Sequence, residues 1–163
     1  MSDPLPTRQA QKERTREAIL AAALRLSHDH GFAQLSLRQV TRQAGVVPTA
    51  FYRHFQSMDE VGLALVEQSF TTLREMIRGA QRDPNIVDNL IDASADVLLA
   101  ALKQNRGHFA FVARERLGGA AAVRAAIQHE LELFMSELAM FLGRVPQLAE
   151  WSTDDVKMVS GLF

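Results

Sequence analysis

The sequence predicts an all-α protein: an N-terminal three-helix head followed by a larger antiparallel helical bundle. Three observations carry this prediction. Apolar residues recur at three- and four-residue steps through most of the chain, which is the period of an amphipathic helix. Glycines and prolines stand between these segments, where helices end and begin. No segment shows the sustained alternation of apolar and polar residues that indicates a half-buried strand.

The composition suits one domain, or a small domain joined to a larger helical one. The chain has 163 residues, of which 47% are hydrophobic and 23% charged, as in ordinary globular proteins. It contains no cysteine, which excludes disulfides and thiolate metal sites. The N-terminus lacks the apolar segment of a secretory signal, and no apolar run approaches the ~20 residues of a membrane span. We therefore expect a cytoplasmic protein without a membrane partner.

Charge is distributed unevenly along the chain. Residues 1–56 carry eight Lys/Arg and four Asp/Glu, whereas the remaining residues carry ten Lys/Arg and fifteen Asp/Glu. The formal net charge of -1 conceals this difference. A basic head on an acidic body favours contact of the head with a polyanion such as nucleic acid. Random scatter of charge is the alternative.

The first two helices are delimited by short local signals. Apolar residues at helical spacing predict a helix over about 11–30, and Gly31 supplies its stop. Ser36 can cap a second helix, and Gln39 three residues later completes a capping-box pattern. Gly45 ends this helix after barely two turns. This short second helix and the helix that follows it across the glycine turn form a helix-turn-helix pattern.

The third helix has an inner and an outer face. Pro48 fits its first turn, where the missing N–H costs nothing. Phe51 and Phe55, four residues apart, share the inner face. At 100° per residue, the outer face and its flanks carry the remaining side chains: Thr49, Ala50, Tyr52, Arg53 and His54.

This outer face has the chemistry of a DNA reader. An arginine pairs with guanine edges in the major groove, and threonine and alanine methyl groups meet the thymine methyl. Tyr52 and His54, at the edges of the face, suit phosphates. The basic side chains of the first helix, Lys12 and Arg16 among them, extend the positive surface. The alternatives are that Tyr52 packs on the following long helix and that the basic residues form a solvated face.

The rest of the chain predicts the bundle. Ser57 and Glu60 form another capping-box pattern before a helix over about 58–81. Further helices are expected from Pro84 to about Gln104, between the glycines at 107 and 118–119, and over 120–142. A last helix begins near 152 and stops in mid-pattern. We therefore expect the bundle to be truncated at the C-terminus.

Apolar side chains in the bundle form a candidate ligand site, because ligands of helical proteins bind between such helices. The candidate lining residues are Phe70, Met76, Ile77, Leu98, Leu102, Phe109, Phe111, Val112, Phe134 and Met135. In the segment RERLGG, Arg114 and Arg116 stand beside a glycine turn, where a phosphate-bearing headgroup could be held. The alternatives are a filled core, and an ion pair of either arginine with Glu115 or a neighbouring helix.

The spacing of these residues resembles the N-terminal domain of the TetR family of bacterial repressors. The resemblance covers residues about 10–60 and is carried by Gly31-Phe32, Leu37-Arg38, Ala44-Gly45-Val46 and Phe51-Tyr52-Arg53-His54-Phe55. The segments PTAFYRHF and RERLGG further resemble the branch of the family that regulates unsaturated fatty acid synthesis and desaturation.

The resemblance implies a homodimer with a DNA-binding domain over residues 1–57, including a flexible arm at about 1–10, and an effector-binding and dimerisation domain over 58–163. It implies a double-stranded palindromic operator as partner, no cofactor, and an acyl-CoA or related acyl thioester as effector. The helix over 58–81 would link the effector site to the spacing of the two heads. Pro48, Thr49, Ala50 and Arg53 match base-reading positions, Tyr52 and His54 match phosphate-contacting positions, and Arg38 matches a groove or backbone contact.

Two departures from the family pattern concern the cap of the recognition helix and one phosphate contact. Val47 stands where the family often has a capping Ser or Thr, and no lysine lies near Met58. Both changes remove a polar group, and the helix N-terminus can still attract a phosphate.

Other classes of function remain as alternatives. An enzyme is not expected, because the sequence has no Ser-His-Asp set, glycine-rich phosphate loop or zinc-spaced cluster. In HDH at 28–30, the two histidines lie two apart on different helix faces, so a metal site is not expected either. A regulator of efflux or catabolism with a different ligand, a regulator with no ligand, and a helical module that binds no DNA are the remaining rivals.

Overall fold

The computed structural model describes residues 7–81 and 103–142, and all regular structure in them is helical. The elements in chain order are α1 (Arg8–His30), the 3₁₀-helix η1 (Phe32–Gln34), α2 (Leu37–Ala44), α3 (Pro48–Phe51), α4 (Met58–Gln81), α7 (Arg106–Gly118) and α8 (Ala121–Leu142). The prediction of an all-α fold with an N-terminal three-helix head and a helical bundle is confirmed.

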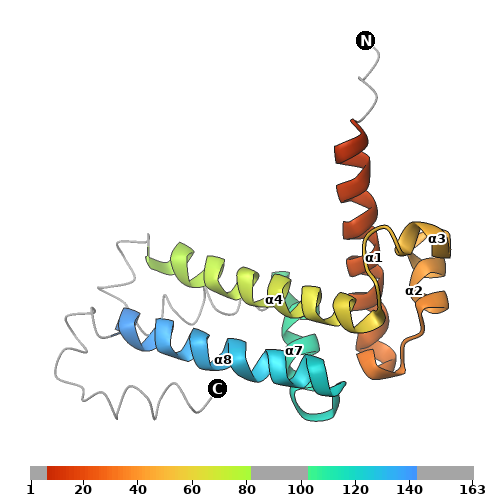
Figure 1. The fold of residues 1–163 in the computed structure, drawn as a ribbon. Coiled ribbons are helices and arrows are strands. Elements are labelled where there is room, and N and C mark those ends of the chain that lie inside the picture. Colours follow the sequence, from red (N-terminus) through yellow and green to blue (C-terminus); the bar gives the residue numbers. More distant parts are fainter. Residues whose placement is uncertain (1–6, 82–102, 143–163) are drawn as a thin grey trace.

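The helices form two groups (Figure 1). The head consists of α1, η1, α2 and α3, and α2 packs against both α1 and α3. The body consists of α4, α7 and α8, in which α4 and α8 lie side by side and α7 packs against both. Helix α1 also packs against α4 and α7, so the two groups share a contact region at the end of α1.

The helix boundaries of the head follow from their caps. The Thr7 side chain accepts the Ala10 N–H at 3.2 Å and so begins α1 slightly before the predicted start. Ser36 and Gln39 form the predicted capping box, because the Ser36 hydroxyl accepts the Gln39 N–H and the Gln39 side chain accepts the Ser36 N–H. Gly45 ends α2 in the left-handed region, with φ 69°, as glycine permits.

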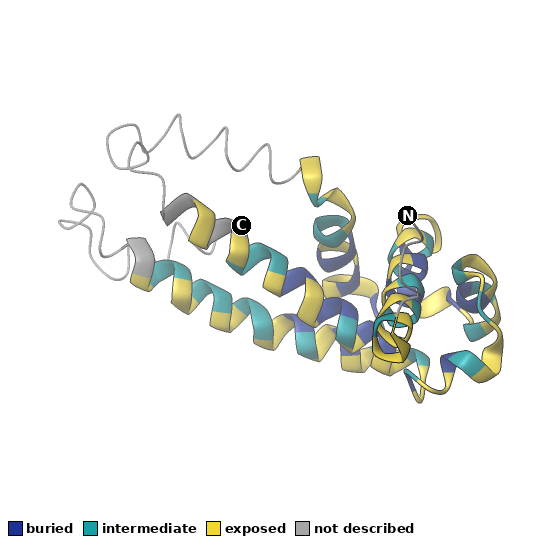
Figure 2. Cartoon of the chain, turned by 90° about the horizontal axis from the view of Figure 1, so that it is seen from above, coloured by how far each residue is buried: buried dark blue, intermediate teal, exposed yellow. Residues whose placement is uncertain are grey.

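One hydrophobic core runs through both groups (Figure 2). Its largest fully buried side chains include Phe51 in the head and Phe70, Leu65 and Ile127 in the body. Burying a side chain of this size stabilises the fold by ~1.5–3 kcal/mol relative to leaving it in water. Because the core is continuous, the head is attached to the body by apolar packing as well as by the chain.

Polar contacts add to the body between α4 and α8. Arg74 donates from Nη2 to Glu130 at 2.8 Å and from Nε to Glu137 at 3.1 and 3.2 Å. These ion pairs remain partly exposed, and pairs in such settings contribute at most about 1 kcal/mol each.

Several sequence predictions fall outside the described residues. They are the helix from Pro84 to about Gln104, the candidate ligand residues Leu98 and Leu102, the side chains of the candidates Met76 and Ile77, and the last helix near 152. Within residues 7–81 and 103–142, no helix is long and apolar enough to cross a membrane.

Candidate nucleic-acid interface

The turn between α2 and α3 fixes where α3 points. The Gly45 N–H donates to the Arg42 carbonyl, and the Val46 N–H donates to the Thr41 carbonyl at 3.0 Å. Pro48 then occupies the first turn of α3, as predicted. Val47 stands at the N-cap with no side-chain hydrogen bond, so the missing cap inferred from the sequence is confirmed.

The recognition segment, residues 48–55, is less regular than predicted. Only Pro48–Phe51 is α-helical. After Phe51 the backbone turns more tightly, because two N–H groups donate to the carbonyl three residues back. The Arg53 N–H donates to the Ala50 carbonyl at 3.2 Å, and the His54 N–H donates to the Phe51 carbonyl at 2.8 Å. Such three-residue hydrogen bonds satisfy carbonyls at a helix end. The prediction of a uniform helix through Phe55 was therefore wrong, and the 100° spacing holds only for its first turn.

The segment nevertheless has a buried inner side and an exposed outer side, as predicted. Phe51 and Phe55 are buried, and their ring centroids lie 5.8 Å apart. Thr49 and Arg53 are exposed, and the Tyr52 side chain is 61% exposed. The Tyr52 ring meets the Phe51 ring edge-on at 5.7 Å. Tyr52 is thus held on the recognition segment rather than covered by the following long helix.

Pro48 is also exposed, and Ala50 is half-buried. The outer surface of the segment therefore presents the Thr49 hydroxyl and methyl, the Tyr52 phenol and the Arg53 guanidinium. Their donors can reach base edges or phosphates, because no described residue covers them.

His54 does not stand freely on the outer surface. It is half-buried, and its Nδ1 is buried with no hydrogen-bond partner among the described residues. Burial lowers the pKa of His54, and the nearby Lys12 on α1 lowers it further. His54 therefore lies on the side of the recognition segment that faces α1 and is uncharged near neutral pH. This half-buried position corresponds to the edge of the outer face, where the sequence places His54.

Helix α1 brings basic side chains to the same region. The Arg16 guanidinium lies over the Phe55 ring, 5.4 Å from its centroid, a cation–π contact of ~0.5–1 kcal/mol at an exposed site. Lys12 is exposed one helical turn earlier, on the same face of α1. The fold thus places cationic side chains of α1 beside the recognition segment.

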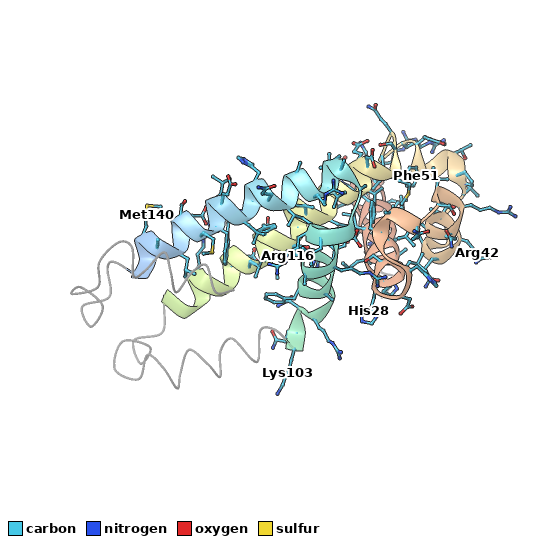
Figure 3. The ribbon with its side chains drawn as sticks, turned by 90° about the horizontal axis from the view of Figure 1, so that it is seen from below. His28, Arg42, Phe51, Lys103, Arg116 and Met140 are labelled. Carbon is cyan, nitrogen blue, oxygen red and sulfur yellow. The ribbon has the colours of Figure 1, made fainter. Side chains whose placement is uncertain are left out.

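Arg38 is exposed on α2, the helix that precedes the turn. Figure 3 shows Arg42 and Phe51 in the head, at the end of the molecule opposite Met140 in the body. The basic side chains predicted to meet DNA all lie on the head, on α1, α2 and the recognition segment.

No metal centre forms in the part of the chain that the structure describes, where no cluster of three His, Cys, Asp or Glu side chains occurs. In the HDH segment, His28 Nδ1 lies 3.1 Å from an Asp29 carboxylate oxygen, and both side chains are more than half exposed. This contact is an exposed local pair at the end of α1.

The candidate ligand residues of the body occupy its core. Phe70 is fully buried and meets Phe134 edge-on, with ring centroids 6.3 Å apart. Phe109 is half-buried on α7. These contacts join α4 and α8 through aromatic packing.

A polar pair lies beside this aromatic contact. The Ser69 hydroxyl donates to the Leu65 carbonyl at 2.7 Å and contacts His108 Nδ1 at 2.8 Å. Because a hydroxyl has one hydrogen, Nδ1 must carry the proton and donate to the Ser69 oxygen. Burial lowers the pKa of His108, which favours this neutral form.

The two arginines of RERLGG, Arg114 and Arg116, have different surroundings. Arg116 is exposed on α7 (Figure 3). Arg114 donates from Nη1 to the His28 carbonyl at 2.8 Å, at the end of α1. The predicted lining residue Phe111 likewise meets Phe32 of the head edge-on, with ring centroids 5.9 Å apart.

Sequence reasoning missed the residue between them. Glu115 is only 2% exposed and accepts the Phe32 N–H at 2.8 Å. An acid flanked by arginines is typical of an exposed helix face, so its burial gives no local signal. The predicted glycine turn offers the only hint, since the Gly119 backbone lies close against Glu115.

Comparisons with known proteins agree with the arrangement of the head. Residues 19–65 match the family described as bacterial regulatory proteins, tetR family. The matched segment runs from the buried part of α1 through the recognition segment into α4.

Solved structures share the fold over most of the chain. A gamma-butyrolactone receptor (ArpA-like protein) is 21% identical, with a TM-score of 0.71, covering 93% of this chain and 75% of its own. FadR from Bacillus subtilis, solved with stearoyl-CoA, is 18% identical, with a TM-score of 0.67 and coverages of 90% and 79%. SmeT, solved with triclosan, is 23% identical, with a TM-score of 0.62 and coverages of 90% and 73%. These structures show the shared fold, and the match of residues 19–65 to the tetR family supports a TetR-like DNA-binding transcriptional regulator.

Proposed function

We propose that this TetR-like regulator binds a palindromic operator as a homodimer and represses genes of fatty acid or lipid metabolism in response to an acyl-CoA or related thioester. The observation that carries the DNA-binding part is the division of the recognition segment. Its apolar half, Phe51 and Phe55, is fixed in the core, whereas Thr49, Tyr52 and Arg53 face outward. Because its inner side chains are packed in the core, this short helix can enter a major groove without rearranging.

Different side chains of this surface contact the bases and the phosphates. Pro48, Thr49, Ala50 and Arg53 meet base edges, with Arg53 as the donor to guanine. Tyr52, Arg38 and Lys12 meet phosphates, which fix the register of the head on the duplex. Arg16 and His54 border the same surface, where Arg16 adds positive charge. Two such heads in a dimer reach successive grooves when they lie about 34 Å apart, or a multiple of that spacing.

Support for an acyl effector comes from the body. Phe70, Phe109 and Phe134 supply apolar surface between helices, where an alkyl chain could insert. The exposed Arg116 is available to a phosphate-bearing headgroup, and Arg114 would have to leave the His28 carbonyl to take part. The Bacillus subtilis FadR structure, which has the same fold, contains stearoyl-CoA.

A second candidate function has its own support. SmeT has the same fold and was solved with triclosan. A regulator of efflux or catabolism that responds to another small apolar molecule would use the same head and the same body packing. The effector, rather than the operator chemistry, separates the two candidates.

Selection of duplexes from a random DNA pool by the protein tests the proposal. We expect enrichment of a palindromic sequence, and we expect binding to weaken steeply with salt, with a log–log slope of about 0.9 per phosphate neutralised. Adding stearoyl-CoA or triclosan to the selected complex then distinguishes the two effectors. A folded protein that enriches no sequence would refute the regulator, and an affinity unchanged by long-chain acyl-CoAs would refute the lipid role alone.

A further inference from the structure

Two consecutive side chains of α7, Arg114 and Glu115, reach out of the body to the head. Helix α7 packs against α1 and η1 (Figure 1). Arg114 contacts the last turn of α1, and Glu115 contacts the first residue of η1. Neither contact serves the DNA-reading surface or the aromatic packing of the body.

Glu115 supplies a cap that the head lacks. The first N–H groups of a helix have no partner within it, and Gly31, which precedes η1, offers no side chain. The Glu115 carboxylate, buried in the body, accepts the Phe32 N–H at 2.8 Å. A buried N–H is costly to leave unpaired, so the head needs this carboxylate in place.

Arg114 makes the matching contact on the other side of Gly31. Its guanidinium donates to the His28 carbonyl at 2.8 Å, where the last carbonyls of α1 are free and a positive charge is favourable. Gly31 has φ 78°, and a Cβ added to it would lie 3.3 Å from Arg114 Nε. The guanidinium therefore lies against the bend between α1 and η1.

Phe32 inserts at the same point into the body. Its ring meets Phe111 of α7 edge-on at 5.9 Å. A Cβ added to Gly62 of α4 would lie 2.7 Å from the Phe32 ring and 2.6 Å from Val123 of α8. Phe32 of the head thus packs against Phe111 of α7 and lies close to Gly62 of α4.

We propose that Arg114 and Glu115 are positioning residues that fix the orientation of the head on the body, so that a displacement of α7 changes the presentation of the recognition segment. The proposal rests on the proposed function for its consequence at DNA, but its structural part does not. It assigns to Arg114 and Glu115 of RERLGG a role in joining the two groups of helices, and it leaves Arg116 available to a headgroup.

Distance measurements between two spin labels test the structural part. The chain has no cysteine, so Gln43→Cys on α2 and His129→Cys on α8, both exposed positions, carry the only labels in a protomer. Mixing with an excess of the unlabelled chain leaves at most one labelled protomer in each dimer, so the measured distance lies within one protomer. We expect one narrow distance distribution for the otherwise unchanged chain and a clearly broader one for Glu115→Leu. Glu115→Gln retains an acceptor for the Phe32 N–H and should keep the narrow distribution, as should the exposed control Glu132→Ala.

A distribution equally narrow in Glu115→Leu and the unchanged chain would overturn the proposal. Should Glu115→Leu fail to fold, Arg114→Ala replaces it, because Arg114 is exposed and its loss leaves the core intact. Arg114→Ala is expected to broaden the distribution, and an unchanged distribution in that variant would likewise overturn the proposal.

Operator binding tests the functional consequence. With a duplex selected by the unchanged chain and stearoyl-CoA as probe, Glu115→Leu should reduce the ligand-induced change in affinity by about fivefold or more, as expected for a lost coupling contact, while Glu115→Gln retains it. A full response in Glu115→Leu would contradict the coupling role. If the unchanged chain selects no duplex, the proposed function fails, and the label distances still decide whether these residues position the head.

Discussion

The head and the body hold their helices in place by different means. In the head, the boundaries of α1 and α2 have local causes: Thr7 and Ser36 cap these helices, and Gly31 and Gly45 end them. In the body, α4, α7 and α8 are joined by contacts between distant residues, such as Phe70 with Phe134 and Arg74 with Glu130. A locally determined head presents a fixed surface, whereas a body assembled from distant contacts can change its packing when a ligand enters.

The largest expected effect comes from removing the inner half of the recognition segment. Phe51→Ala deletes a fully buried aromatic ring and should lower the free energy of unfolding by ~3–5 kcal/mol. DNA binding should be lost with it. Thermal unfolding followed by circular dichroism checks this, with Tyr52→Ala as the matched exposed control. A melting temperature equal to that of the control would show that Phe51 does not hold the segment.

Removing the outer half should leave the fold intact and change recognition. Arg53 is exposed, and Arg53→Ala should cost ~1–3 kcal/mol of binding to the selected duplex while relaxing the preference at one base position. Tyr52→Ala should instead weaken binding to all duplexes alike. Competition binding with single-base variants of the duplex separates the two. Uniform loss on every sequence after Arg53→Ala would exclude base reading by this residue.

Restoring the missing cap should stabilise the head slightly. Val47 is 62% exposed and makes no capping hydrogen bond. Val47→Ser should raise the free energy of unfolding by about 1 kcal/mol, because a serine oxygen can accept an N–H of the first turn of α3. Chemical denaturation measures this, and Val47→Ala is the control without an acceptor. Equal stability of the two variants would mean that α3 is too short to benefit.

The smallest expected effect concerns pH and lies in the body. Burial lowers the pKa of His108 below 6.5, so the folded protein binds this proton less readily than the unfolded chain. The resulting stability is fully present above pH 6.5 and is lost as the pH falls toward the folded pKa. His108→Gln should reduce this dependence in denaturation curves between pH 5 and 8. An unchanged pH dependence in that variant would assign the effect to other groups, with His54 first among them.

The difference between local contacts in the head and distant contacts in the body explains which features could be predicted from the sequence. The capping box, the glycine stops and the burial of Phe51 and Phe55 depend on residues at most four apart, and all are visible in the sequence. At Arg53 and His54 the backbone departs from the α-helix by forming hydrogen bonds to the third residue back. The spacing of apolar residues in the sequence does not show this change. The contacts of Arg114 and Glu115 join residues 86 and 83 positions apart. No local pattern shows that an acid between two arginines is buried against the head.

The affinity of the protein for its selected duplex, relative to a scrambled duplex of the same length and composition at one salt concentration, tests the central claim most directly. Reading of bases by the exposed half of the recognition segment predicts a ratio of at least ~10³, reduced by Arg53→Ala. Equal affinity for the two duplexes, in a protein shown to be folded, would contradict the claim that this segment is a sequence-specific reader.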